Sequence, residues 1–315
     1  MPPRGLFVGL ATLDLVQRVA RRPGVNEKVV AQRSDIAAGG PAAVAAVTFG
    51  ALGGHSVLLS ALGPGPIGRL AAGELDRAGV HIMDAWAAGA DLSISAITVL
   101  EETGERSVVS RNAEDMMAVV PGDLLALTRD ADVVLLDGHH PGLAAAAAHA
   151  ARAAGVPVVL DCGSPKRVYA ELMPLADVVV CSASFVADRS ERFDREGFDP
   201  DEGFHAVAAA LLANGGRLMA MTAGAAPVRW RTREAAGAIE VPPVTVRDTL
   251  GAGDVLHGAV AFARARGVTD PEHSLSFGVA VASLRVQHIG PRVWLNDQRL
   301  RALIVACPGS SDVRG

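Results

Sequence analysis

The chain has 315 residues, of which 50% are hydrophobic, 20% charged and 4% aromatic. This composition excludes a disordered chain, and the 34 glycines lack the every-third-residue period of collagen. A formal net charge of −5 argues against binding to nucleic acid or to an acidic membrane surface. The three cysteines have no CxxC spacing, which excludes a zinc knuckle or a disulfide framework and fits a cytoplasmic protein.

The N-terminal half contains two segments that interrupt an otherwise regular α/β pattern. Residues 13–36 and 92–112 are each long enough for two strands, and Glu101–Glu105 is a polar turn between two alternating runs. The first apolar stretch is too short for a signal peptide, and 42–52 is too short to cross a membrane. We therefore predict a β-sheet lid (13–36 and 92–112) over an α/β core (1–12, 37–91 and 113–307), with 308–315 a loose tail.

The second half alternates short β-branched runs with alanine-rich helices. The predicted strands are 132–136, 157–160, 177–180 and 217–221, and 142–154 is a predicted helix. This spacing is typical of βαβ units and a parallel sheet covered on both faces. The strands end in polar residues, which should line one crevice because ligands bind at the carboxyl ends of parallel strands: Asp137, Asp161, Ser182 and Thr222.

The stretch 248–258, DTLGAGDVLHG, is the most informative one. Gly251, Ala252 and Gly253 form a tight turn at the start of a predicted helix (255–265), where backbone amides and the helix dipole favour an anion. Asp254 follows in the first turn and is placed to take a proton from a hydroxyl that attacks phosphorus. Taken alone, this short motif favours the simpler interpretation, in which Asp254 is a helix cap and the glycines only turn the chain.

In its context, DTLGAGD followed by VLHGA resembles the second signature of the ribokinase-type (PfkB) sugar kinase family. The first signature resembles 38–43 with the segments that follow to 80, Gly9 with Asp14 resembles the opening strand, and 221–224 resembles the strand end that meets the nucleotide. The resemblance covers nearly the whole chain, including both lid segments. It implies a ribokinase-like three-layer αβα sandwich with a mostly parallel sheet, and an ATP-dependent carbohydrate kinase that phosphorylates a hydroxyl of a sugar or sugar-like molecule.

The resemblance also implies roles for individual residues. Asp254 would be the catalytic base, and the amides of Gly251, Ala252 and Gly253 would hold the phosphoryl group. Sugar hydroxyls would be bound by Asp14, Gly39 and Gly40. Thr222 and Gly224 would contact ATP, with Gly278, Val279 and Ala282 walling the adenine. Mg²⁺ would accompany ATP, Asp248 and Thr249 lie where some members bind a monovalent cation such as K⁺, and lids of this kind often pair in a homodimer.

Within the family, GGPAA at 39–43 and DVLHGA at 254–259 resemble the sulfofructose kinase branch most, with ketohexokinase next. Lys28 falls where that branch has a lysine for the sulfonate. The position of the branch's arginine falls on His139, and the position of its asparagine falls on Ser110. A neutral His and a Ser are poorer partners for a full negative charge than a guanidinium. The chain also departs from the family at three other places, where it has Val44 for Asn, GPGP at 63–66 for Gly-Asp-Asp, and SASF at 182–185 for Asn-x-x-Glu.

Two other functions remain open at this point, and the first is an NAD-binding oxidoreductase. Gly63-x-Gly65-x-x-Gly68 has the spacing of a dinucleotide fingerprint, with Asp84 about twenty residues on, although Pro64 and Pro66 remove amides that pyrophosphate would need. A non-catalytic sugar- or nucleotide-binding regulator of the same fold is the second alternative. The intact Asp254 argues against it.

Overall fold

The computed structural model describes residues 1–189, 200–307 and 309. Its core is a nine-stranded sheet in the order β15-β14-β13-β12-β11-β10-β1-β4-β5. Neighbouring strands from β5 to β13 are parallel, and β14 and β15 continue the sheet antiparallel. The strand bounds are β1 Arg4–Val8, β4 His55–Ser60, β5 Val80–Asp84, β10 Val133–Leu136, β11 Val158–Cys162, β12 Val178–Ser182, β13 Leu218–Ala223, β14 Ala226–Arg231 and β15 Ala236–Ile239.

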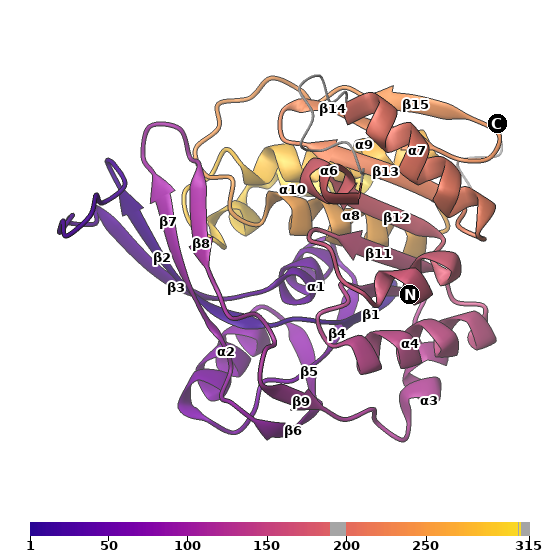
Figure 1. The fold of residues 1–315 in the computed structure, drawn as a ribbon, viewed down its shortest axis with the longest axis horizontal. Coiled ribbons are helices and arrows are strands. Elements are labelled where there is room, and N and C mark those ends of the chain that lie inside the picture. The colour runs from indigo at the N-terminus through magenta and orange to yellow at the C-terminus, as the bar shows by residue number, and fades with distance from the viewer. Residues whose placement is uncertain (190–199, 308, 310–315) are drawn as a thin grey trace.

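Helices cover both faces of this sheet, which confirms the three-layer α/β class (Figure 1). One layer contains α1 (Pro41–Ala51), α2 (Pro66–Arg77), α8 (Ala252–Ala265), α9 (Pro271–Arg285) and α10 (Gln298–Ala306). The other contains α3 (Leu124–Arg129), α4 (Pro141–Ala154), α5 (Tyr169–Leu172), α6 (Ala183–Arg189) and α7 (Pro200–Ala213). Single-turn 3₁₀ helices span Met173–Leu175 and Val293–Asn296. Two apolar clusters, one on each face, hold the layers together.

The strands of the core form where the sequence predicts buried β-branched runs. All four residues of β10 are buried, because both faces of this central strand are covered by helices. The alanine-rich α4 ends at Gly155, whose left-handed φ of 71° closes the helix. These regular units bring the carboxyl ends of β10, β11, β12 and β13 to one edge of the sheet.

A second, four-stranded sheet extends from the core (Figure 1). It contains β2 (Thr12–Val19), β3 (Arg33–Gly39), β7 (Ile94–Leu100) and β8 (Arg106–Val109), in the order β3-β2-β7-β8. The two hairpins join through parallel pairing of β2 with β7. We call this sheet the lid.

A separate ribbon of β6 (Trp86–Gly89) and β9 (Met116–Ala118) was not predicted. Its two strands are short and mostly exposed, so their sequence lacks the alternation that marks a half-buried strand. The predicted tail 308–315 lies, except for residue 309, outside the described residues. No helix in the described part of the chain is long and apolar enough to cross a membrane.

Candidate active site

The glycine-rich turn leads directly into α8. Gly251 is the N-cap with a left-handed φ of 71°, a conformation that costs glycine little, and Val255 N donates to Gly251 O at 2.9 Å. Ala252 N donates to Thr249 O at 3.3 Å, so this predicted phosphoryl donor is used within the turn. Within residues 1–189, 200–307 and 309, no acceptor takes the amides of Gly251, Gly253 or Asp254. These three amides form the donor set at this helix start.

The space beside these amides is open. A Cβ placed on Gly253 would meet no atom within 4 Å, and Gly253 is exposed. On the other side, Val44 of α1 lies against the turn, with its Cγ1 3.5 Å from a Cβ placed on Gly251. The turn therefore has room for a ligand on the Gly253 side and an apolar wall on the Val44 side.

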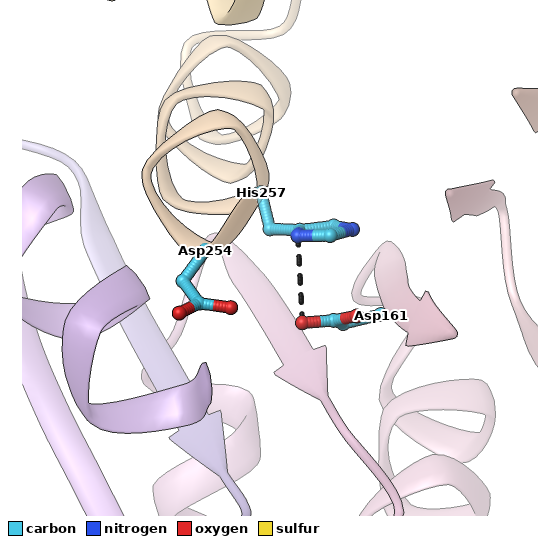
Figure 2. A group of neighbouring side chains, drawn as sticks. All are labelled: Asp161, Asp254 and His257. Carbon is cyan, nitrogen blue, oxygen red and sulfur yellow. Dashed lines mark ion pairs between the residues drawn. The ribbon is translucent and has the colours of Figure 1, made fainter. Parts of the chain in front are cut away.

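Asp254 belongs to a group of three polar side chains from α8 and the end of β11 (Figure 2). One carboxylate oxygen of Asp161, one of Asp254 and a ring nitrogen of His257 all lie within 4.8 Å of one another. His257 Nδ1 is 3.4 Å from Asp161 Oδ2, and His257 Nε2 is 3.4 Å from Val180 O. Both ring nitrogens thus face oxygens, and His257 and Asp161 form a pair beside the Asp254 carboxylate (Figure 2).

The surroundings of Asp254 favour its protonated form. Desolvation by the surrounding protein, and then the negative charge of Asp161, raise the pKa of Asp254 to about 6, although part of the residue is accessible to solvent. A protonated His257 and Arg106 oppose this rise, and Asp14 adds to it. A carboxyl with a pKa near neutrality can both accept and release a proton at physiological pH.

The lid contacts the turn just before the free amides. Thr249 donates to Gly104 O through its amide at 3.1 Å and through Oγ1 at 2.9 Å, and Arg106 Nη1 donates to Thr249 O at 3.1 Å. Gly104 has φ 69°, and a Cβ there would press against the backbone of Arg247 and Asp248. The tip of the β7–β8 hairpin is therefore docked onto 247–249.

Asp14 faces the core from the lid strand β2. Its Oδ1 accepts a hydrogen bond from Thr12 Oγ1 at 2.7 Å, and burial raises its pKa. A Cβ on Gly39 would collide with the Asp14 carboxylate, and a Cβ on Gly40 (φ 91°) would collide with Leu10 O. Ser95 pairs with Asp14 across the lid and lies 3.2 Å from Ser110 (Oγ to Oγ), so the structure brings Asp14, Gly39, Gly40 and Ser110 into one neighbourhood.

The other two predicted substrate residues are placed differently. His139 is bound to Asp137, with 2.9 Å from its amide and 3.3 Å from Nδ1 to Asp137 Oδ1, and its side chain is mostly buried. Lys28 is exposed on the long loop between β2 and β3, at the outer end of the lid (Figure 1). In the described part of the chain, Lys28 makes no hydrogen bond or ion pair, so the structure does not join it to Asp14.

The predicted nucleotide residues divide into two groups. Thr222 lies at the end of β13, where its Oγ1 donates to Cys181 O at 3.3 Å, and Gly224 follows in an open turn with φ 62°. Gly278 instead allows α9 to approach α8, since a Cβ there would be 2.9 Å from Val260 Cγ2. Val279 is buried in the core, whereas Ala282 is partly exposed, so of the three predicted adenine residues Ala282 offers the most accessible surface.

The predicted cation residues are already engaged. Asp248 is buried and forms an ion pair with Arg285, with Oδ2 and Nη2 3.3 Å apart. Thr249 is bound to Gly104 as described above. The residues present do not fit a monovalent cation at Asp248, because a guanidinium already neutralises this carboxylate.

The Gly63–Gly68 loop does not have the chemistry of a dinucleotide site. The Asp91 carboxylate lies at the start of α2, 3.4 Å from the amides of Ile67 and Gly68, where a pyrophosphate would bind. Asp84 accepts hydrogen bonds from the amides of Leu62 and Gly63 and is not free for a ribose. Both carboxylates would repel an anionic cofactor.

Comparison with known proteins agrees with this geometry. A family model described as pfkB family carbohydrate kinase matches residues 5–298. The chain belongs to the pfkB family of carbohydrate kinases. A ribokinase of Arabidopsis thaliana is 27% identical over 94% of this chain and 79% of the plant protein. An ATP-dependent ribose-1-phosphate kinase of Halopiger xanaduensis is 28% identical over 65% of this chain and 70% of its own.

Solved structures show the same pfkB fold. A protein of Agrobacterium tumefaciens, provisionally described as a ribokinase, superposes with a TM-score of 0.83 at 26% identity, over 97% of this chain and 98% of the other. The Arabidopsis ribokinase complexed with ribose and ATP gives 0.77 at 24% identity, over 96% and 99%. The family match does not distinguish the sulfofructose kinase and ketohexokinase branch, which stays a prediction.

Three residues of this pfkB site were not selected from the sequence. His257 lies three positions after Asp254, so helical spacing places both side chains on one face of α8 and could have found it. Arg106 and Arg285 come from the lid and from α9, far from 247–254 in the chain. No local spacing identifies them, because their contacts depend on the tertiary fold.

Proposed function

We propose that this pfkB kinase transfers the γ-phosphoryl group of ATP to a hydroxyl of a neutral sugar or sugar-like molecule. The observation that carries the proposal is the position of the Asp254 carboxylate, with a pKa raised to about 6, next to the free amides of Gly251, Gly253 and Asp254. A base and an anion-binding turn side by side are what attack of an alcohol on phosphorus requires.

The transfer proceeds in one displacement. The substrate oxygen attacks the γ-phosphorus and forms the new O–P bond, while the bond to the β–γ bridging oxygen breaks and ADP leaves. Asp254 accepts the hydroxyl proton, and the three free amides stabilise charge on the transferred oxygens. Arg106 of the lid adds positive charge on the Asp254 side of the site. The docked lid excludes water, the competing acceptor.

The substrate lies between the lid and the turn in this proposal. Asp14, with the backbone of Gly39 and Gly40, binds sugar hydroxyls, and Ser110 and His139 contribute further polar contacts. The electrostatics favour a neutral substrate over a sulfonated one, because Asp14 is acidic, His139 is paired with Asp137, and Lys28 lies on an outer loop. Val44 gives the pocket an apolar wall at the phosphoryl side.

The nucleotide lies over the carboxyl end of β13 in this proposal, with Thr222 and Gly224 at its phosphates or ribose and Ala282 near its base. Mg²⁺ would accompany ATP and screen its phosphates. The segment 182–185 does not fit a direct metal ligand, because it carries no carboxylate. Its Ser182 Oγ already donates to Gly163 O and accepts a hydrogen bond from Phe185 N. We assign no step to a protein-bound metal there.

The test is ATP consumption by the purified protein over hexoses, ketoses, pentoses, nucleosides and sulfo-sugars, with D254N as the inactive control. We expect ADP formation with at least one neutral sugar and its loss in D254N. Binding of ATP and sugar without turnover in the wild type would instead identify a regulator. Turnover restricted to sulfo-sugars would contradict the neutral-substrate assignment.

The lid also offers a surface for a homodimer. One row across its outer face contains Ile36, Leu15, Ala96 and Val109, which are paired in register and exposed. An apolar row of this kind on a soluble sheet indicates an interaction surface. We expect a dimer by light scattering and a monomer for V109D; a wild-type monomer would contradict the assignment.

A further inference from the structure

The ion pair between Arg285 and Asp248 is the most deeply buried one in the described residues. Arg285, at the end of α9, is 1% exposed and Asp248 is 2% exposed. Nη2 of Arg285 lies 3.3 Å from Asp248 Oδ2, and Nη1 donates to His288 O at 2.9 Å. Burial lowers the pKa of the Arg285 guanidinium and Asp248 opposes this, so the guanidinium keeps its charge.

Asp248 in turn fixes the backbone on which the anion site depends. Its Oδ1 accepts from Leu250 N at 2.9 Å, and its Oδ2 accepts from Gly290 N at 3.0 Å. The first bond holds the residue next to Gly251, and the second ties this turn to the loop after α9. Loss of the charge on Asp248, or of its partner, would therefore loosen the turn itself.

Three successive carbonyls before the turn each accept from an arginine. Arg18 Nη1 donates to Arg247 O at 3.0 Å, Arg285 Nη1 to Asp248 O at 3.5 Å, and Arg106 Nη1 to Thr249 O at 3.1 Å. Positive charge thus lies at the carbonyl oxygens of 247–249, and the free amides belong to residues that follow directly, Gly251, Gly253 and Asp254. The amides of the same three peptide groups donate to Val286 O, Gly104 O and Asp248 Oδ1, so each peptide group before the turn is held at both ends.

A monovalent cation would use these same oxygens. It would need carbonyls such as those of Asp248 and His288, together with one carboxylate, and Arg285 already contacts all of these groups. A second cation there would meet the guanidinium charge at close range, inside a buried site with weak screening. The guanidinium therefore occupies the position of such an ion and supplies the same positive charge.

We propose that Arg285 is a built-in cation that organises the phosphoryl-binding turn, so that this kinase has no need of K⁺ or another monovalent ion. Arg285 touches no reacting atom and is a positioning residue. The activity measurements described below rest on the proposed kinase function. The measurements of thermal unfolding require only the folded protein.

The first experiment exchanges ions for the wild-type protein. Thermal unfolding and sugar-dependent ATP turnover are measured in potassium, sodium, ammonium and tetramethylammonium chloride at equal ionic strength. We expect the unfolding temperatures to agree and the rates to differ by less than about twofold, since only general screening changes. A saturable, K⁺-specific stimulation or stabilisation of the wild type would overturn the proposal.

The second experiment replaces the Arg285 guanidinium with a neutral side chain. R285M leaves Asp248 buried without its counter-charge, so we expect K⁺ to raise the unfolding temperature of R285M by about 2–4 °C over tetramethylammonium. Turnover of R285M should fall at least about tenfold and recover partly with K⁺. R285K keeps a positive charge and should remain independent of K⁺. R152M, which removes an exposed arginine, is the matched control and should behave as wild type.

The outcomes separate the two proposals. A folded R285M that shows no K⁺ response in unfolding temperature overturns the built-in cation, whatever the activity. If R285M does not fold, R285K and the wild-type ion exchange decide. If no sugar is phosphorylated, the proposed function fails, while the K⁺-dependent stability of R285M still tests the inference.

Discussion

Asp254 and Asp137 are two carboxylates at the same edge of the sheet, and their surroundings differ sharply. Asp137 follows β10 and accepts hydrogen bonds from the amides of Leu10 and Ala42 through Oδ2 and of His139 through Oδ1. Although burial opposes it, the charge and hydrogen bonds of His139, with the amide of Leu10, hold the pKa of Asp137 well below its usual range. In the part of the chain that the structure describes, no amide donates to the Asp254 carboxylate, and burial raises its pKa to about 6.

In the proposed mechanism, one fold uses the same functional group in two ways. The satisfied carboxylate joins three segments: the start of the lid region, the start of α1 and the loop after β10. The unsatisfied carboxylate is costly to ionise, and for that reason it can take a proton from a substrate. We therefore expect Asp137 to matter for stability and Asp254 for turnover.

The largest effect should come from D254N. The amide cannot accept the hydroxyl proton, so we expect kcat to fall by about 10²–10⁴-fold while ATP and sugar still bind. Steady-state kinetics and calorimetric binding measure the two properties. Near-normal turnover in D254N would show that another group is the base.

D137N should instead destabilise the fold. One carboxylate oxygen becomes an amide donor facing backbone N–H groups, so we expect the free energy of unfolding to fall by roughly 3 kcal/mol at pH 7. The folded pKa of Asp137 is depressed, so its stabilisation is present above the unfolded value and is lost as pH falls through the folded pKa. Urea unfolding at several pH values tests this, with the exposed D123N as control.

D254N should change stability in the opposite direction. The folded pKa of Asp254 is raised to about 6, so above pH 6 the wild type carries the full cost of ionising it, and D254N removes this cost. We expect D254N to be more stable than wild type by up to roughly 3 kcal/mol at pH 8, and the gain to vanish near pH 4. Equal destabilisation by D254N and D137N would abolish the contrast between the two sites.

D14N should weaken the substrate and not the nucleotide. Loss of a charged acceptor for sugar hydroxyls should raise the KM of the sugar about 10–100-fold, with a much smaller change in the KM of ATP. Varying each substrate at saturation of the other separates the two constants. A parallel rise in both would place Asp14 outside the sugar pocket.

The smallest effect is a shift in the pH profile. Because Asp254 must be ionised to act as the base, log kcat/KM should fall below about pH 6. H257Q removes a charge that favours ionisation and should move this limb to higher pH, and D161N removes a charge that opposes it and should move the limb lower. Shifts in the same direction would show that the pair does not act on Asp254 electrostatically.

Local pattern predicted the parallel strands, the helix that starts at the glycine-rich turn, and the resemblance that led to the family. It could not predict that the Ala252 amide donates to Thr249 O, or that Gly278 packs closely against α8, because both depend on local geometry and helix packing. Asp137 is a strand-end residue in the sequence, and only the tertiary fold shows that its oxygens are satisfied. Arg285 was invisible for the same reason, since its partner lies 37 positions away.

The docking of the β7–β8 hairpin onto Thr249 has a consequence for the hydrolysis of bound ATP by water. If the lid swings outward to admit a sugar, Gly104 leaves with it, and Thr249 loses the carbonyl that holds both its amide and its hydroxyl. The cradle for the migrating group would then be complete only after the acceptor is enclosed. An enzyme with bound ATP and no sugar would then hydrolyse little ATP, because the closure that encloses the sugar also completes the phosphoryl-binding turn.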